Sequence, residues 1–139
     1  MTLEKFRLTH SELIEHYQYI ELHLEGIYAI ICEKGFISGL KEVEKSNIGK
    51  IVHEIRKIEK EENLSIIPQD IYERINKAME RRNFWCHNCY VDMIFKTNGE
   101  PKKQEDIDSL IADAREAKSL RDILYEIKIN LLPNAIPII

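Results

Sequence analysis

The 139-residue chain lacks any apolar run long enough to cross a bilayer, and residues 1–7 lack the apolar core of a signal peptide. We therefore expect a cytoplasmic protein with no membrane partner. Its three cysteines, an odd number, do not make a disulfide framework. Glycine (5) and proline (4) are scarce, which favours helices over turn-rich sheets.

An excess of positive charge is also missing. The net charge of −4 at pH 7 argues against strong non-specific binding of nucleic acid. It leaves room for a small local basic site, and Arg74, Lys77, Arg81 and Arg82 do cluster. Such a cluster is equally typical of a solvated helix face.

What the chain does have is apolar residues at helical spacing, with enough length for one core and one domain, residues 1–139. Short links between the periodic segments indicate an all-α fold, an antiparallel four-helix (up-and-down) bundle. Gly39 and the residues that follow it are expected to form a connection. The apolar tail, 133–139, is expected to pack on the bundle or on a partner chain. The expected helices run from the N-cap Ser11 to about Lys34 with Gly35 as stop, from near Ser46 to Asn63, from Pro68 towards Ile94, and from the turn Asn98–Pro101 to Pro133.

The most informative stretch, residues 81–90, can be interpreted as two unrelated chemistries. Its Trp-Cys-x-x-Cys string is found in dithiol redox sites, but these need a preceding strand and a first cysteine at a helix N-terminus. Here we expect Cys86 and Cys89 well inside a helix. A zinc site needs a second ligand pair, and Cys32 is alone. We interpret Cys86 and Cys89 as buried core residues.

Metal chemistry of the di-iron bundle type is disfavoured as well. Such bundles use Glu-x-x-His pairs, and no acidic residue stands three positions before any of the five histidines. His16 and His23 share a helix face and, with Glu12, could bind a metal. Flanking positions of a packing seam explain them better. We therefore predict no metal and no cofactor.

The second chemistry uses Arg82, Asn83 and His87. On a continuous helix Asn83 and His87 lie one turn apart on one face, and Tyr90 follows at the next turn. Arg82 is rotated by about 100° to the border of that face, within reach of His87 through its long side chain.

The string of residues 80–90 resembles the signature of HEPN domains (higher eukaryotes and prokaryotes nucleotide-binding). In that signature an Arg is followed by a His after four to six residues, often with Asn after the Arg and an aromatic after the His. Arg82, Asn83 and His87 match it, whereas Tyr90 stands third after the His and many HEPN toxins have the aromatic second. The resemblance implies a helical bundle and a metal-independent endoribonuclease in which two protomers pair.

In that reaction the resemblance implies that His87 exchanges protons with a ribose 2′-hydroxyl or the leaving 5′-oxygen. Arg82 would stabilise charge on the phosphate, Asn83 would orient His87 or the phosphate, and Tyr90 would support them. The leading hypothesis is therefore a homodimeric ribonuclease of toxin–antitoxin or phage-defence type, with RNA as substrate and an antitoxin as a possible partner protein. The alternative is a non-catalytic HEPN-like module that binds a nucleotide, RNA or a protein. A metal or redox bundle using Cys86 and Cys89 ranks last.

Overall fold

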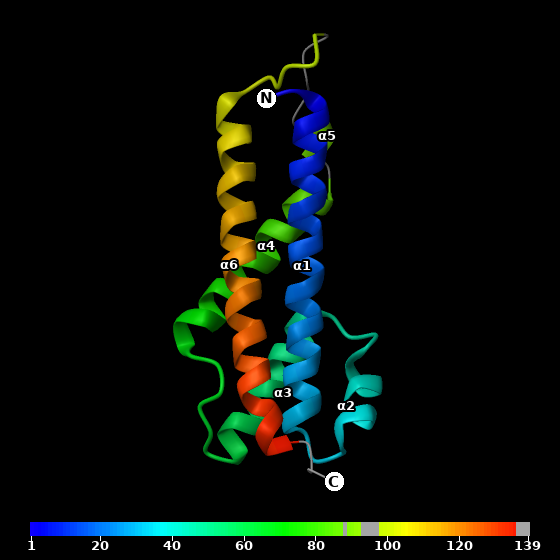
Figure 1. Cartoon of the computed structure of the whole chain (residues 1–139), viewed down its shortest axis with the longest axis vertical. Coiled ribbons are helices and arrows are strands. Elements are labelled where there is room, and N and C mark those ends of the chain that lie inside the picture. Colours follow the sequence, from blue (N-terminus) through cyan, green and yellow to red (C-terminus); the bar gives the residue numbers. More distant parts are fainter. Residues whose placement is uncertain (88, 93–97, 136–139) are drawn as a thin grey trace.

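A computed structural model describes residues 1–87, 89–92 and 98–135, which form helices and loops without a β-strand (Figure 1). The prediction of an all-helical protein is confirmed. None of the helices in these residues is long and apolar enough to cross a membrane. The helices are α1 (Leu3–Ile31), α2 (Phe36–Val43), α3 (Ile48–Glu61), α4 (Gln69–Cys86), α5 (Cys89–Asp92) and α6 (Gln104–Ala135).

The two long helices, α1 and α6, lie side by side and run parallel (Figure 1). Two contacts between them have the same sequence separation of 105 residues, as parallel helices require. Arg121 Nη1 lies 3.1 Å from His16 Nδ1, and Lys128 Nζ lies 2.9 Å from His23 Nδ1. In an up-and-down four-helix bundle the first and last helices run antiparallel. The predicted antiparallel arrangement is therefore wrong for this pair.

The shorter helices lie behind and beside the long pair (Figure 1). Helix α4 crosses behind it and runs antiparallel to α6, because Arg74 pairs with Glu116 and the later Arg81 pairs with the earlier Asp113. Helix α3 lies behind the lower half of the pair, and α2 lies beside the lower part of α1. The core contains buried side chains from all five of these helices, α1, α2, α3, α4 and α6.

Helix α2 occupies a segment for which the sequence predicts a connection. Its Gly39 is buried against the end of α1, where an added Cβ would stand 2.5 Å from Cys32 Sγ and 2.9 Å from the Ala29 Cα. The glycine therefore allows close helix packing and does not break the helix. Val43, which is 1% exposed, completes this contact.

Several helix boundaries differ from the prediction. Helix α1 begins eight residues before the expected N-cap, because Thr2 caps it through a hydrogen bond that its Oγ1 accepts from the Lys5 N–H at 3.2 Å. The added turns bury Phe6, which stabilises the longer helix. At the other end, α6 continues two residues past Pro133, which lies in its last turn.

Other boundaries are confirmed. Asn63 has a φ of 53° and follows the end of α3, as expected of a stop residue. Pro68 is the N-cap of α4, next to the position predicted. Gly99 has a φ of 81°, and the Asn98 side chain accepts a hydrogen bond from the Glu100 N–H at 3.2 Å, which makes the expected turn.

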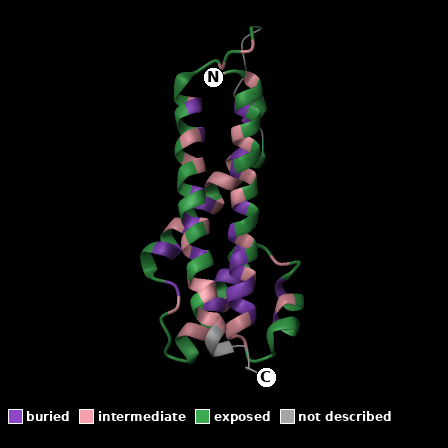
Figure 2. Ribbon diagram, in the orientation of Figure 1, coloured by how far each residue is buried: buried purple, intermediate pink, exposed green. Residues whose placement is uncertain are grey.

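The core follows the predicted seam of α1 and extends onto all the longer helices (Figure 2). Its largest fully buried side chain is Trp85, near the end of α4. In sequence, the spacing of three and four residues predicts an apolar seam for a neighbouring helix at Leu13, Tyr17, Ile20, Leu24, Ile27 and Ile31. All of these are buried except Ile31, which is partly exposed.

The interface between α1 and α6 should weaken in acid because of His23. This residue is 5% exposed, and burial, followed by the nearby Lys128 cation, lowers the pKa of its imidazole from 6.5 to about 4. A folded pKa below the unfolded one means that the stabilisation is present above pH 6.5 and is lost as the pH falls towards 4. The loss should be on the order of 2–3 kcal/mol of unfolding free energy.

Urea unfolding across this pH range measures the effect. His23→Asn keeps an acceptor for Lys128 and removes the titration, so its stability should fall less than that of wild type. The exposed His53 provides the control, and His53→Asn should behave as wild type. Parallel curves for wild type and His23→Asn would contradict the assignment.

Candidate functional site

Helix α4 ends in the middle of the segment that carries the candidate residues. Its last residue is Cys86, and His87 follows in an extended conformation (φ −121°, ψ 130°) with its N–H donating to the Asn83 carbonyl. The prediction of a continuous helix towards Ile94 is therefore wrong. Residues 93–94 lie outside the described residues.

A histidine on α1 gives the physical reason for this helix end. His10 Nε2 lies 2.8 Å from the Trp85 carbonyl oxygen, the acceptor that the N–H of Cys89 would use in a continuous helix. The bond satisfies that carbonyl and frees the chain to turn into α5. His10 was not among the site residues predicted from the sequence. Its spacing from Phe6 and Leu13, four residues after one and three before the other, places it on the packing seam and could have found it.

The helix end separates Tyr90 from the face on which it was predicted. Tyr90 packs against α1, with its ring centroid 5.3 Å from that of His10 and 5.9 Å from that of Phe6. Its hydroxyl lies 3.5 Å from His10 Nδ1, and burial raises the pKa of the phenol. The single helical face predicted for Asn83, His87 and Tyr90 is not formed.

Arg82 points towards α1 and is loosely held there. Its Nη1 lies 3.8 Å from Glu21 Oε2, and both side chains are about one third exposed. An ion pair of this length and exposure contributes little to stability. The pair lines a hollow of about 260 Å³ together with Ile14, Tyr17, Gln18 and Cys86. Asn83 and His87 are exposed at the same end of α4.

The basic cluster of α4 is partly used to attach this helix to α6. Arg81 Nε donates to Asp113 Oδ2 at 2.6 Å, and the Trp85 indole N–H donates to the same oxygen at 2.7 Å. Arg74 Nε lies 2.5 Å from Glu116 Oε1. Two of the four basic residues therefore hold helices together, and of the cluster Lys77 and Arg82 have no close carboxylate partner within 3.5 Å in the described part of the chain.

The two cysteines of the Trp-Cys-x-x-Cys string have different surroundings. Cys89 is 3% exposed, which confirms the prediction of a core residue, whereas Cys86 is exposed, so the prediction is wrong for that thiol. Cys86 lies at the C-terminal end of α4, whereas the first cysteine of a dithiol redox site lies at a helix N-terminus.

Cys89 is close to an imidazole that cannot activate it. Its Sγ lies 3.6 Å from His10 Nε2, the nitrogen whose proton is donated to the Trp85 carbonyl. The other ring nitrogen, Nδ1, lies next to the Tyr90 hydroxyl. No group of three potential metal ligands forms among the described residues, Cys32 included.

His16 and His23 flank the seam between α1 and α6, as the packing interpretation predicts. Their Nδ1 atoms accept hydrogen bonds from Arg121 and Lys128, two cations that occupy the place a metal would need. Burial and the neighbouring cations lower the pKa of both imidazoles, so that each ring is held in its neutral form.

Neither protein-family models nor comparisons with curated proteins and solved structures gave a match to this chain. The resemblance of residues 80–90 to the HEPN signature therefore stays a prediction. The function proposed below rests on the geometry around Arg82 and His87.

The difference between the cysteines predicts their reactivity. Cys86 should react with an Ellman-type reagent at least ten times faster than Cys89, because only Cys86 is exposed. Stopped-flow absorbance of the native protein gives the two rates, and all three thiols should react once the protein is denatured. Cys86→Ser should remove the fast phase, and Cys89→Ser should leave it. A fast phase that survives Cys86→Ser would contradict the position of the helix end.

Proposed function

We propose that the chain is a metal-independent endoribonuclease of toxin–antitoxin or phage-defence type, completed by pairing of two copies, with Arg82 and His87 as catalytic residues. One observation carries the proposal. The end of α4 carries a weakly paired guanidinium, which lines a hollow, and an exposed imidazole five residues later in the chain. Neither side chain holds helices together, whereas Arg81 and Trp85 both donate hydrogen bonds to Asp113 of α6.

The reaction follows from the chemistry of these two groups. The neutral imidazole of His87 takes the proton of a ribose 2′-hydroxyl, and the 2′-oxygen forms a bond to the adjacent phosphorus. The bond to the 5′-oxygen then breaks, and that oxygen must receive a proton. The products are a 2′,3′-cyclic phosphate and a 5′-hydroxyl. Arg82 holds the phosphate oxygens, on which negative charge builds up, through planar N–H donors.

Pairing supplies the second proton-transfer group. One imidazole cannot be neutral and protonated at the same moment, whereas two copies of His87 across one cleft provide a base and an acid. The two copies of Arg82 would also add positive charge to the cleft of an otherwise acidic protein. A partner protein that covers His87 would then act as an antitoxin.

The supporting residues Asn83 and Tyr90 have different roles in the proposed reaction. Asn83 is exposed next to Arg82 and can hydrogen-bond a phosphate or His87. Tyr90 packs on His10 and Phe6, so we assign it to holding α5 on α1 rather than to proton transfer. Glu21 competes with a phosphate for Arg82, and the 3.8 Å separation means that the competition is weak.

A second candidate is a non-catalytic HEPN-like module that binds a nucleotide, RNA or a protein. It is favoured by the ion pairs of Arg74 and Arg81 with α6, which remove half of the basic cluster from the surface available to phosphates. The two candidates differ in whether His87 is needed for cleavage or plays no chemical part.

Cleavage of a labelled RNA in the presence of EDTA tests the catalytic proposal. His87→Ala should lower the rate by about 10²–10⁴-fold, the usual contribution of an acid–base group. Arg82→Ala should lower it by about 10²–10³-fold through lost charge stabilisation. The matched controls are His53→Ala and Arg115→Ala, which remove an exposed histidine and an exposed arginine elsewhere.

The outcomes separate the two candidates. Cleavage by His87→Ala at the wild-type rate would contradict the catalytic proposal. An absence of cleavage by the wild type, together with RNA binding that Arg82→Ala weakens and His87→Ala does not, would favour the binding module. A cyclic phosphate at the cut end would confirm the 2′-hydroxyl as nucleophile.

A further inference from the structure

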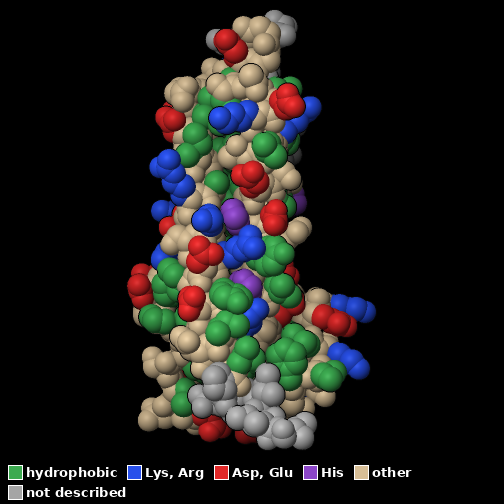
Figure 3. Space-filling model, viewed as in Figure 1, with side chains coloured by type: hydrophobic (Ala, Val, Ile, Leu, Met, Phe, Trp, Pro, Cys, Tyr) green, Lys and Arg blue, Asp and Glu red, His purple; other side chains and the backbone are tan. Residues whose placement is uncertain are grey.

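The face of the α1/α6 pair opposite α4 has two matched sets of side chains. The first set is His16 with Arg121, and the second is His23 with Lys128. We name these four residues the cation groove. His23 follows His16 by seven residues, and Lys128 follows Arg121 by seven, so the two sets lie about 10 Å apart along the helices. Figure 3 shows histidine side chains with basic side chains beside them in the middle of one face.

The two cations of the groove lack an ion-pair partner among the described residues. Neither Arg121 nor Lys128 forms an ion pair with a carboxylate in the described part of the chain, and each gives a hydrogen bond to a neutral imidazole. Burial lowers the pKa of Lys128, which means that its charge is partly desolvated. An acidic group placed beside it would offset that cost.

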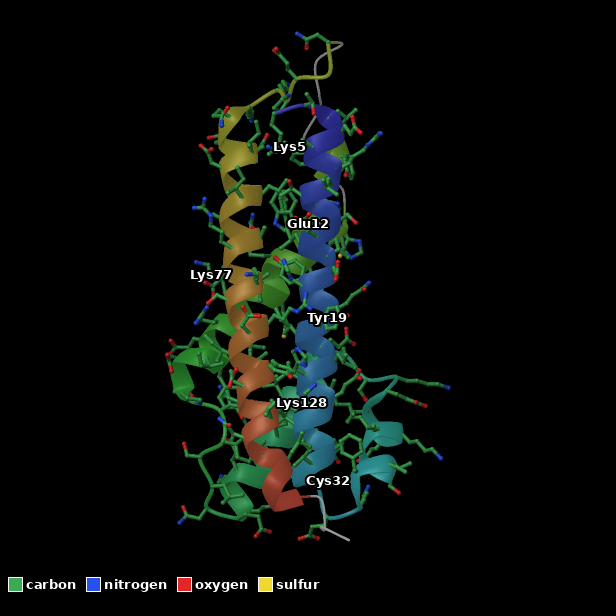
Figure 4. All side chains as sticks on the ribbon, viewed as in Figure 1. Lys5, Glu12, Tyr19, Cys32, Lys77 and Lys128 are labelled. Atoms are coloured by element: carbon green, nitrogen blue, oxygen red, sulfur yellow. The ribbon has the colours of Figure 1, made fainter. Side chains whose placement is uncertain are left out.

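Lys128 reaches across the groove because of a glycine. An added Cβ on Gly26 of α1 would lie 2.7 Å from Lys128 Cδ, so the lysine stem crosses α1 where a side chain is missing. Figure 4 shows Lys128 between the two long helices and Tyr19 above it on α1. The ammonium lies 5.6 Å from the Tyr125 ring centroid, and the Arg121 guanidinium lies 3.8 Å from that of Tyr19.

Exposed apolar side chains accompany these cations. Tyr19 is 37% exposed, and Leu22 and Tyr125 are each 47% exposed. No described helix covers this face, since α2, α3 and α4 lie beside or behind the long pair (Figures 1 and 2). Apolar side chains next to cations that lack an ion-pair partner are typical of a protein interface.

We propose that the cation groove and the exposed Tyr19, Leu22 and Tyr125 bind an amphipathic helix of a partner protein. The partner helix carries two acidic side chains one heptad apart, one for Arg121 and one for Lys128. A third helix packed along a helix pair presents the same face every seven residues, which matches the repeat of the groove. Its apolar residues pack on the tyrosines and on Leu22.

Neighbouring carboxylates define the partner further. Glu12 and Glu15 lie close enough to His16 to oppose the lowering of its pKa, and Asp122 opposes that of His23. A uniformly anionic ligand, such as a polyphosphate or a nucleic acid, would be repelled by these three groups. A helix with two acids and flanking basic or neutral residues would not. The charges therefore favour a protein helix over a polyanion.

This surface is independent of the proposed ribonuclease site. On α1, the hollow next to Arg82 uses Ile14, Gln18 and Glu21, whereas the cation groove uses His16 and His23. At 100° per residue the two sets point in nearly opposite directions. Loss of one site should leave the other in place.

Binding of a synthetic helix tests the proposal. The probe is a fluorescent amphipathic peptide with a leucine stripe and two glutamates seven residues apart, and its control has lysines in place of the glutamates. The full-length wild type should bind the glutamate peptide at least tenfold more tightly. The double variant Arg121→Glu/Lys128→Glu should lose this preference and bind the lysine peptide instead. Anisotropy titrations without RNA give the affinities.

Two further variants keep the test interpretable. Arg121→Gln/Lys128→Gln removes the charges without repulsion and should bind both peptides equally. The control Arg115→Glu/Lys57→Glu makes the same charge change at exposed positions elsewhere and should keep the wild-type preference. Circular dichroism confirms that each variant is folded.

Three results would overturn the proposal. One is equal binding of both peptides by the wild type. Another is a dimer of the protein alone that the Arg121→Glu/Lys128→Glu variant dissociates, which would assign the groove to a second copy. The third is binding of inorganic pyrophosphate, lost in Arg121→Gln/Lys128→Gln, without peptide binding.

Discussion

The parallel alignment of α1 and α6 is the constraint on which the rest of the structure depends. Because both helices run the same way, the chain between them must return along the whole pair. Helix α4 provides most of that return, crossing behind the pair and fixed to α6 where Asp113 accepts hydrogen bonds from Arg81 and Trp85. The position of Arg82 against α1 follows from this crossing, as does the exposure of His87 beyond the helix end.

A single acceptor, the Trp85 carbonyl, decides what the candidate segment can do. Its bond to His10 replaces the next helical hydrogen bond and turns the chain into α5. Tyr90 and Cys89 are thereby drawn onto α1, whereas Cys86 and His87 are left at the surface. The decapeptide is thus divided into a packed part and an exposed part, and this division does not follow the two chemistries that its sequence suggests.

Local patterns predicted much of the fold and less of the site. The buried seam of α1, the stop at Asn63 and the turn at Gly99 depend on neighbours in sequence, and all three are found. The parallel pairing and the end of α4 depend on contacts between residues more than seventy positions apart, which no local period contains. Helix α2 was missed because Gly39 is usually a breaker, whereas here it allows helices to touch.

The parallel pair also determines how the molecule responds to force. Met1 lies at one end of the long axis and the last turn of α6 at the other (Figure 1). Tension between these ends would slide α1 along α6 rather than peel one helix from the other. The contacts of the seam, including those of His16 and His23, would then carry the load together and not one after another. A pull along the long axis therefore loads the seam between α1 and α6 in shear.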